Sequence, residues 1–252
     1  MSSPGGDAPA FPPGVLERRG HALRLGALSA RAYVPLTPAL VARLPGWYED
    51  AAREGVALRD GSVVRIGGLV VKRFPAPGAF GRLRAPHATR SAARHFWCLP
   101  VPSPRPLVAL WRNRASMSVL VREYVAGQPL SAQGAAERAA ETALAPFLAS
   151  LARHAVLHGD LHPENILWDG SRWWLLDVDG VRHGLHSRRR VWLGMWARCA
   201  LYLGAARARG HFDACMAVVG PRWQLAWEAV RAEEQAMRSR RAYDLPTREV
   251  RP

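Results

Sequence analysis

Three side chains with the chemistry of phosphoryl transfer lie close together in the second half of this chain. Asp160 belongs to the string His158–Leu167, Asn165 follows it in the same string, and Asp177 comes after a further apolar segment. Phosphoryl transfer from a nucleotide uses one carboxylate to accept the proton of the attacking hydroxyl group. It also uses an amide and a second carboxylate to hold the metal ions that bridge the phosphates. We therefore predict Asp160 as catalytic base, with Asn165 and Asp177 as metal ligands.

The second informative residue is Lys72, the only lysine in a chain whose lysines and arginines number 35 together. It lies in the strand-like segment Leu69–Phe74. Its ammonium group is a compact point charge, which suits the α and β phosphates of a nucleotide. The alternative is a surface lysine on a strand. Because every other basic side chain of the Lys/Arg type in this chain is an arginine, we predict that this one lysine is kept to bind phosphate.

A turn ahead of this strand could cover the nucleotide. Asp60-Gly61 is a tight-turn dipeptide between the predicted strands Val56–Arg59 and Ser62–Ile66, and Gly67-Gly68 leads into the strand of Lys72. Gly61 and Ser62 are therefore candidates for capping phosphates with backbone amides. The chain contains no GxGxxG or Walker A sequence, so this prediction has little motif support.

The remaining pattern predicts a mixed first half and a mostly helical second half, without internal repeats. We expect a disordered tail over 1–20, an N-terminal lobe over 21–125 and a C-terminal lobe over 126–252. Thr37 could cap the first expected helix, and the helix over 131–154 is expected to be interrupted near Pro146. The expected helices span 38–44, 47–53, 88–99, 131–154, 188–209 and 223–240. The further expected strands are 107–110, 117–124, 166–168 and 173–178.

The net charge of +15 indicates an anionic partner, or else a base composition that favours arginine codons. Two clusters stand out, Arg82, Arg84, Arg90 and Arg94 in one and Arg182, Arg188, Arg189 and Arg190 in the other. The Arg188–Arg190 run could line an acceptor site or form a solvated helix start. Since no nucleic-acid motif accompanies these arginines, we expect no nucleic-acid partner.

Carboxylates are concentrated where the charge would suit a cation. Asp160, Glu164, Asp169, Asp177 and Asp179 fall within one short window of a basic chain. Asp179 could support Asp177, bind a second ion or be a solvated turn residue. His158 and His162 are expected to brace the loop by hydrogen bonds rather than act as acid or base, and zinc ligation is not expected because no third ligand has the spacing.

The three cysteines and the absence of a targeting signal bear on the compartment. Cys98, Cys199 and Cys215 are odd in number and lack metal-type spacing, which indicates free thiols in a reducing compartment. No signal peptide or membrane-spanning apolar run is visible. We expect a cytoplasmic protein.

These residues resemble the protein-kinase-like superfamily and, within it, the bacterial lipopolysaccharide kinases that phosphorylate Kdo or heptose of the inner core. The resemblance covers Val56–Leu203 and is most specific in His158–Leu167. Arg90–Phe96, with the proline-rich segment after it, is similar to that family's regulatory helix and following loop. Val121–Gly127 resembles the hinge whose backbone hydrogen-bonds adenine, which makes Glu123 and Val125 candidate nucleotide-binding residues.

The resemblance implies an α+β, two-lobed, protein-kinase-like fold with a small antiparallel-sheet N-lobe and a mainly helical C-lobe. It implies ATP and Mg²⁺ as cofactors and an anionic glycolipid or sugar as acceptor. By this analogy Asp160 is the base, Asn165 and Asp177 bind the metal, and Lys72 binds phosphates. An acceptor of this class would place the protein peripherally at the cytoplasmic face of the inner membrane.

One departure from the resemblance keeps other functions open. Kinases pair the strand lysine with a glutamate on the next helix, but no acidic residue lies between Lys72 and Glu123, and His95 takes that position. Either another group orients Lys72 or only the nucleotide does, which leaves a catalytically impaired nucleotide-binding module as an alternative.

Two further enzyme classes share the same loop. An aminoglycoside- or choline-type phosphotransferase would need an acidic pocket for its cationic substrate, which the excess of arginine disfavours. A protein kinase is disfavoured because no Ala-Pro-Glu signature follows Asp177 and the remaining chain is short for the usual helical lobe.

Overall fold

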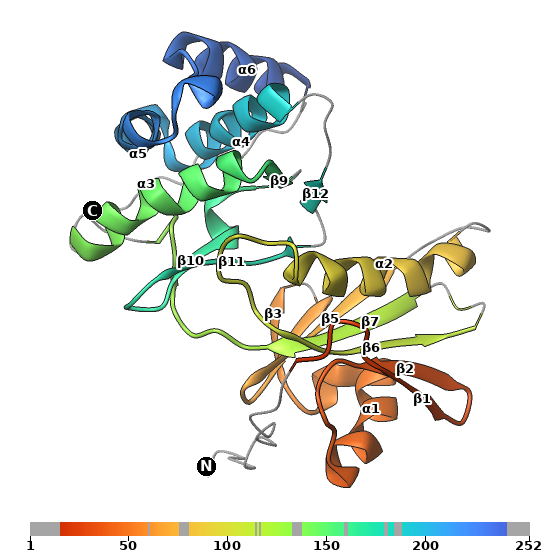
Figure 1. The fold of residues 1–252 in the computed structure, drawn as a ribbon. Coiled ribbons are helices and arrows are strands. Elements are labelled where there is room, and N and C mark those ends of the chain that lie inside the picture. The colour runs from red at the N-terminus through yellow and green to blue at the C-terminus, as the bar shows by residue number, and fades with distance from the viewer. Residues whose placement is uncertain are drawn as a thin grey trace. The chain divides into compact units, whose positions relative to one another are not determined.

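The computed structural model describes residues 16–59, 61–75, 81–113, 115, 117–132, 138–158, 161–178, 181–183 and 188–240. The chain divides into two compact units (Figure 1). The first comprises Met1–Gly127 and Trp174–Val181, and the second comprises Gln128–Trp173 and Arg182–Pro252. The segment that carries Asp177 thus belongs to the first unit. Most of the expected tail, residues 1–15, lies outside the described residues.

The first unit is built on an antiparallel sheet. Among its described residues, seven strands follow the order β1-β2-β6-β7-β5-β4-β3 (Figure 1). They are β1 (His21–Leu25), β2 (Leu28–Ala32), β3 (Val56–Arg59), β4 (Val63–Ile66), β5 (Leu69–Pro75), β6 (Pro106–Arg112) and β7 (Met117–Glu123). The predicted strands β3 to β7 are confirmed. The β1–β2 hairpin was not predicted, because the buried side chains of β2 are Leu28, Ala30 and Ala32, a weak apolar signal.

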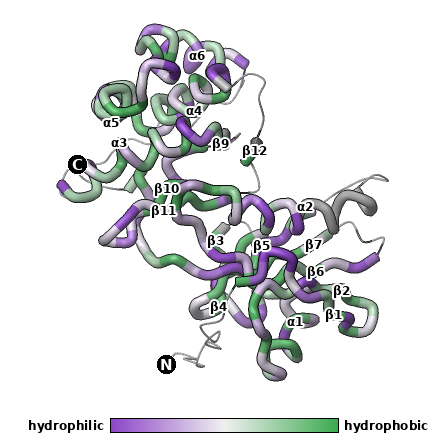
Figure 2. Tube along the Cα trace, viewed as in Figure 1, coloured by the Kyte–Doolittle hydropathy of each residue, from purple (hydrophilic) through white to green (hydrophobic). Residues whose placement is uncertain are grey.

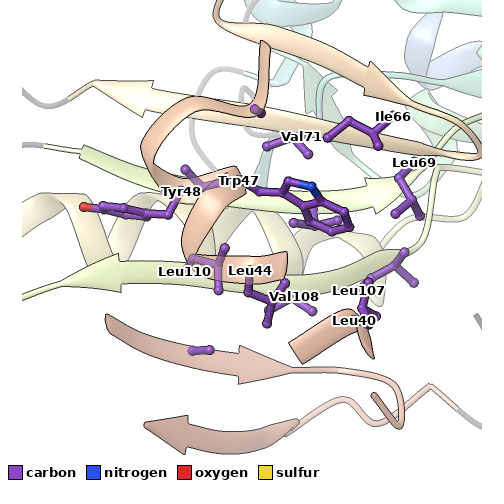
Figure 3. Close-up of a cluster of buried hydrophobic side chains, with 14 of the residues drawn as sticks. Leu40, Leu44, Trp47, Tyr48, Ile66, Leu69, Val71, Leu107, Val108 and Leu110 are labelled. Atoms are coloured by element: carbon purple, nitrogen blue, oxygen red, sulfur yellow. The ribbon is translucent and has the colours of Figure 1, made fainter. Parts of the chain in front are cut away.

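Helix α1 (Pro38–Asp50) covers one face of this sheet. The Thr37 hydroxyl accepts a hydrogen bond from the Leu40 amide at 3.3 Å, which confirms the predicted N-cap. Leu44 and Trp47 are fully buried against the sheet. Figure 3 shows these side chains with residues of β4, β5 and β6 gathered around the Trp47 indole.

The prediction of two separate helices in this segment was wrong. Helix α1 continues through Pro45, and a 3-10 turn, Ala51–Arg53, follows it directly. A proline inside a helix removes one backbone hydrogen bond. Burial of Leu44 and Trp47 on the same helical face, on both sides of the proline, outweighs that cost.

The opposite face of the sheet is covered by α2 (Gly81–Phe96), which packs on β6 and β7. Ala92 and Ala93 are buried there against Ala109 and Leu120. The small alanines let the helix approach the sheet closely. The helix begins well before the predicted start at residue 88.

We expect Leu44→Ala to lower the free energy of unfolding by about 2–5 kcal/mol, because it leaves a cavity at the centre of the α1 cluster. Denaturant unfolding measures this change. The matched control is Leu58→Ala on β3, where the leucine is half exposed. A loss as large at position 58 as at position 44 would contradict the described core.

The second unit is mainly helical. Its helices are α3 (Arg138–Arg153), α4 (Arg188–Leu203), α5 (Ala205–Val218) and α6 (Trp227–Arg240). Short strands β8 (Gln128–Pro129), β10 (Ile166–Trp168) and β11 (Trp173–Leu175) form one small sheet, and β9 (Val156–His158) and β12 (Val181–His183) form another. The chain enters the first unit within β11.

Aromatic side chains form much of the core of the second unit. Trp192 packs edge-on against Trp196, which packs in the same way against Phe212, and Phe212 meets Trp227. The Trp192 indole also donates to the Trp223 carbonyl at 3.0 Å. Hydrophobic and hydrophilic residues both occur along α6 (Figure 2), and its described buried residues, Val230 and Glu234, are one helical turn apart.

Several predicted helix boundaries were wrong in this unit, and α6 begins at Trp227 rather than at residue 223. Helix α3 is not interrupted at Pro146, because Leu144, Phe147 and Leu148 are buried on both sides of it. The expected helix over 188–209 ends at Leu203, and α5 begins after Gly204, whose φ of 81° suits glycine. Among the described helices, none has both the length and the hydropathy needed to cross a membrane.

Candidate active site

Lys72 lies in the interior of the sheet of the first unit. Strand β5 is flanked by β4 and β7, and Lys72 pairs with Val63 on one side and Leu120 on the other. Val71 points toward α1, so the two-residue period of the strand directs Lys72 to the opposite face. Its side chain is only 13% exposed, and its Nζ lies 5.1 Å from the centre of the Phe74 ring. Lys72 is therefore a part-buried cation, and the surface-strand alternative does not hold.

Asp177 follows β11 on the segment that belongs to the first unit. The strand ends at Leu175, whose amide donates to the Pro102 carbonyl at 2.9 Å. The prediction that the strand extends to residue 178 was therefore wrong. Asp177 has φ 54°, a left-handed conformation that few side chains tolerate and that Asp and Asn adopt most readily. Residues in such backbone conformations cluster at functional sites, which is consistent with the candidate role of Asp177.

The structure brings Lys72 and Asp177 together. The Lys72 Nζ donates a hydrogen bond to Asp177 Oδ1, and the two part-buried groups form an ion pair. This contact identifies a carboxylate that orients Lys72 although the helix after β5 carries none. His95, which the sequence analysis aligned with the missing glutamate, has its Nε2 3.2 Å from the Ser91 hydroxyl. Sequence analysis missed the pairing, since 105 positions separate the two residues.

The turn between β3 and β4 contains Gly61 and Ser62. Gly61 has φ 75°, and a Cβ at this position would meet no atom within 4 Å, so the backbone conformation rather than space requires glycine. The Ser62 carbonyl accepts a hydrogen bond from the Arg73 amide at 2.8 Å, which ties the turn to β5. Asp60 lies outside the described residues.

The candidate hinge follows β7. The Arg105 guanidinium donates to both Glu123 carboxylate oxygens at 3.0 and 3.3 Å, a bidentate contact that fixes the end of the strand. The Tyr124 amide bonds to the Gly68 carbonyl at 2.9 Å. Within the described residues, no hydrogen bond engages the backbone of Val125. Val125 therefore meets one requirement for recognising an adenine edge.

Asn165 lies in the second unit, in a 3-10 turn over Pro163–Asn165 between β9 and β10. It is buried, and its Nδ2 lies 3.2 Å from His162 Nε2. The His162 ring in turn packs against the Tyr202 ring, with 5.2 Å between centroids. When the amide nitrogen faces the histidine, Oδ1 is the atom turned away from it, and a metal ligand of this type coordinates through that oxygen.

Other residues of the predicted loop are placed only in part. Asp160, the predicted base, and Asp179 lie outside the described residues. On either side of Asp160, the side chains of His158 and Leu161 are 1% exposed. Glu164 is exposed, and its carboxylate accepts a hydrogen bond from Ser131 at 2.5 Å. The loop is thus anchored on both sides of Asp160.

The basic run at the start of α4 is solvent-accessible where described. Arg189 and Arg190 are exposed, and the Arg189 guanidinium donates to the Gln224 carbonyl at 3.2 Å. The side chain of Arg188 lies outside the described residues.

No protein-family model matches the chain, and no curated protein sequence matches it. Solved structures do match. The chain is similar to the aminoglycoside-3'-phosphotransferase of type VIII at 20% identity and a TM-score of 0.50, over 70% of this chain and 90% of that one. It is similar to the bifunctional kinase-methyltransferase WbdD at 15% identity and a TM-score of 0.45, over 87% of this chain and 49% of that one. It is also similar to the Mycobacterium tuberculosis PknI kinase domain at 16% identity and a TM-score of 0.41, over 70% and 88%.

The first of these similarities establishes the fold. The antiparallel sheet of the first unit and the helices of the second are those of a protein-kinase-like fold, which confirms the predicted fold class. An identity of 20% is informative about the fold alone, because one fold hosts many functions.

Proposed function

We propose that this chain is an ATP-dependent phosphotransferase that phosphorylates a hydroxyl group of an anionic sugar, with Kdo or heptose of the lipopolysaccharide inner core as the acceptor. The observation that carries the proposal is the ion pair of Lys72 with Asp177 in a protein-kinase-like fold. Both residues were singled out from the sequence for separate roles around nucleotide phosphates, and they meet although the helix glutamate is missing.

The donor set suits the cofactors. Carboxylate oxygens of Asp177 and the amide oxygen of Asn165 are hard ligands of the kind that Mg²⁺ prefers, and Lys72 supplies an ammonium group for phosphate. When bound, magnesium would neutralise the negative charge of the phosphates. Backbone groups of Glu123 and Val125 would orient adenine, and amides of Gly61 and Ser62 would cap phosphates.

Asp160 would take the proton from the acceptor hydroxyl group. The neighbouring loop is braced by the contact between His162 and Asn165, which holds the amide in place. A module that only binds nucleotide has no use for such a base. The retention of Asp160 with Asn165 and Asp177 thus supports catalysis over the impaired-module alternative.

The acceptor class follows from charge. The chain carries a net charge of +15, and an acceptor with carboxylate and phosphate groups complements arginines, whereas a cationic aminoglycoside does not. Such an acceptor would bring the protein to the cytoplasmic face of the inner membrane, where anionic lipids attract basic surfaces.

A substrate screen tests the proposal. Purified protein with ATP and Mg²⁺ is offered Kdo-lipid A, heptosylated core, an aminoglycoside and choline in separate reactions. We expect ADP release to depend on the Kdo or heptose acceptor, with one phosphoryl group found on that acceptor by mass spectrometry. Stimulation by the aminoglycoside or choline alone would replace the acceptor assignment, and nucleotide binding without turnover on any acceptor would favour the non-catalytic module.

We expect Lys72→Met to weaken ATP binding and turnover by about 10- to 100-fold each, because a charge-assisted hydrogen bond contributes roughly 1.5–3 kcal/mol. Nucleotide titration and ADP release measure the two effects. The matched control is Arg53→Met, which removes a cation from a surface ion pair in the same unit. Equal losses in the two variants would argue against a phosphate-binding role for Lys72.

A further inference from the structure

A basic cavity lies in the first unit, apart from the residues of the candidate active site. Its volume is about 630 Å³, within the range of small-molecule pockets. Three parts of the chain line it. They are the segment before β1, strand β2 with Tyr33 after it, and helix α2 with Cys98 shortly after its end. The lining residues are Arg18, Arg19, Arg31, Tyr33, Arg90, Arg94 and Cys98.

Five guanidinium groups line this one cavity, and no described carboxylate is among its lining residues. Guanidinium groups stay charged at any physiological pH, so their mutual repulsion cannot be relieved by deprotonation. Within the described residues, no ion pair joins Arg18, Arg19 or Arg94 to a carboxylate. The cavity thus concentrates positive charge, and three of its guanidinium groups have no described carboxylate partner.

Several arginines elsewhere in the described residues do have such a partner. Arg43 pairs with Glu54 at 2.6 Å, Arg105 pairs with Glu123, and Arg209 pairs with Asp213 at 2.7 Å; the same holds for Arg53, Arg172, Arg238 and Arg240. A general enrichment in arginine would distribute guanidinium groups over the surface. It does not explain why five of them line one cavity whose described lining residues include no carboxylate.

The cavity also presents donors in a fixed arrangement. Arg31 donates from Nη1 to the Arg19 carbonyl at 3.0 Å, while its buried Nε has no acceptor among the described residues. Arg90 and Arg94 are one helical turn apart on α2 and so lie on the same helical face. Burial raises the pKa of Tyr33, against the lowering effect of nearby arginines, so its hydroxyl keeps a proton to donate.

We propose that this cavity binds a ligand with at least two neighbouring phosphate groups. One phosphate monoester carries a charge of about −1.5 to −2, so two or three such groups would balance five arginines. Arginine forks bind phosphate oxygens in bidentate fashion, and the cavity has room for more than one phosphate. In the sheet, β6 and β7 separate β2 from β5, so this phosphate site is distinct from Lys72.

Cys98 offers a direct test because it lines the cavity and is exposed. Cys199 and Cys215 are buried, and burial raises the pKa of each thiol to about 12, so neither competes for a thiol reagent at neutral pH. The probe is inorganic pyrophosphate, and the readout is the rate of Cys98 alkylation by neutral iodoacetamide. At ten times its Kd, pyrophosphate should slow alkylation about tenfold, because only the unoccupied form reacts.

The double variant Arg18→Gln/Arg94→Gln removes one cation from each of two sides of the cavity. We expect it to weaken pyrophosphate protection of Cys98 by at least about tenfold, from the loss of two charge-assisted contacts. The matched control, Arg24→Gln/Arg53→Gln, removes two exposed cations outside the cavity, so the net charge of the two variants is the same. Thermal unfolding of both variants verifies that they fold.

Further arms separate the sources of phosphate. Lys72→Met should leave the protection of Cys98 unchanged, since protection does not depend on the candidate active site. Phosphatidylglycerol vesicles are tested in the same way. If they protect Cys98 as pyrophosphate does, and the protection is likewise weakened in Arg18→Gln/Arg94→Gln, the phosphate site also binds lipid headgroups. If the vesicles have no effect, the ligand is a free phosphorylated molecule. Three results would overturn the proposal. They are no protection of Cys98 by pyrophosphate at low ionic strength, equal protection in the two double variants, and protection by vesicles but not by pyrophosphate.

Discussion

Asp177→Asn should lower turnover by at least about 10³-fold, the scale of losing a group that stabilises the charge of a transferring phosphoryl group. The amide keeps the shape of the side chain but loses the negative charge that a metal ion and the Lys72 ammonium group require. Magnesium-dependent nucleotide binding should weaken with it. ADP release on the acceptor found in the screen and nucleotide titration with and without Mg²⁺ measure both effects.

Asparagine is the informative replacement because of the backbone. Asp177 has φ 54°, and Asn tolerates this left-handed conformation about as well as Asp, whereas Ala would add strain. Removing the charge should also lower the free energy of unfolding by about 1–3 kcal/mol, since it leaves a part-buried ammonium group without its carboxylate. Lost turnover with the fold retained is therefore the expected combination.

The control for this variant is Asp169→Asn. Asp169 belongs to the turn between β10 and β11, where its carboxylate accepts hydrogen bonds from the amides of Ser171 and Arg172, both at 2.8 Å. It undergoes the same chemical change but has no predicted role in phosphoryl transfer. If Asp177→Asn retains the turnover of Asp169→Asn, the assignment of Asp177 as metal ligand is wrong.

Local signals were sufficient for Lys72's own strand, β5, and for the two strands before it, β3 and β4. Tight turns at Gly61 and at Gly67-Gly68 separate short apolar runs, and such turns leave adjacent strands little choice but to pair as hairpins. Thr37 was equally informative, since its hydroxyl satisfies an amide at the start of α1. In each case the deciding contacts lie within a few residues of one another.

Long-range packing accounts for what sequence analysis missed. Pro45 and Pro146 looked like helix boundaries, but buried side chains on both sides of each proline hold α1 and α3 continuous. The candidate active site also depends on contacts between residues that are far apart in the sequence. The chain offered Lys72 and Asp177 as separate candidates, and only the fold shows that one neutralises the other.

The basic cavity is a further example of this dependence. Arg90 and Arg94 stood out as part of a cluster in the sequence, but Arg18, Arg19 and Arg31 did not. Arg18 and Arg19 fell within the expected tail, and Arg31 lies in a hairpin that was not predicted. Spatial clustering of charge depends on which strands are neighbours, and β2 reaches its neighbour β6 across a long stretch of chain.

Asp160→Asn should lower turnover by about 10²–10⁴-fold, the range for loss of a general base. ATP affinity should stay close to that of the unaltered protein, because a base that accepts a proton in the transition state contributes nothing to ground-state binding. The rate constant kcat and the ratio kcat/KM should then fall by the same factor, which steady-state kinetics on the preferred acceptor measures.

The control in the same loop is Glu164→Gln. Glu164 is exposed and bonds to Ser131, so its loss should leave the turnover nearly unchanged. The two aspartate variants then give different patterns, since Asp177→Asn loses metal-dependent binding while Asp160→Asn keeps it. A nucleotide-binding module without catalysis could produce the first pattern but not the second, because it has no proton transfer to lose. Full turnover in Asp160→Asn would place the base elsewhere and remove the main sequence argument for catalysis.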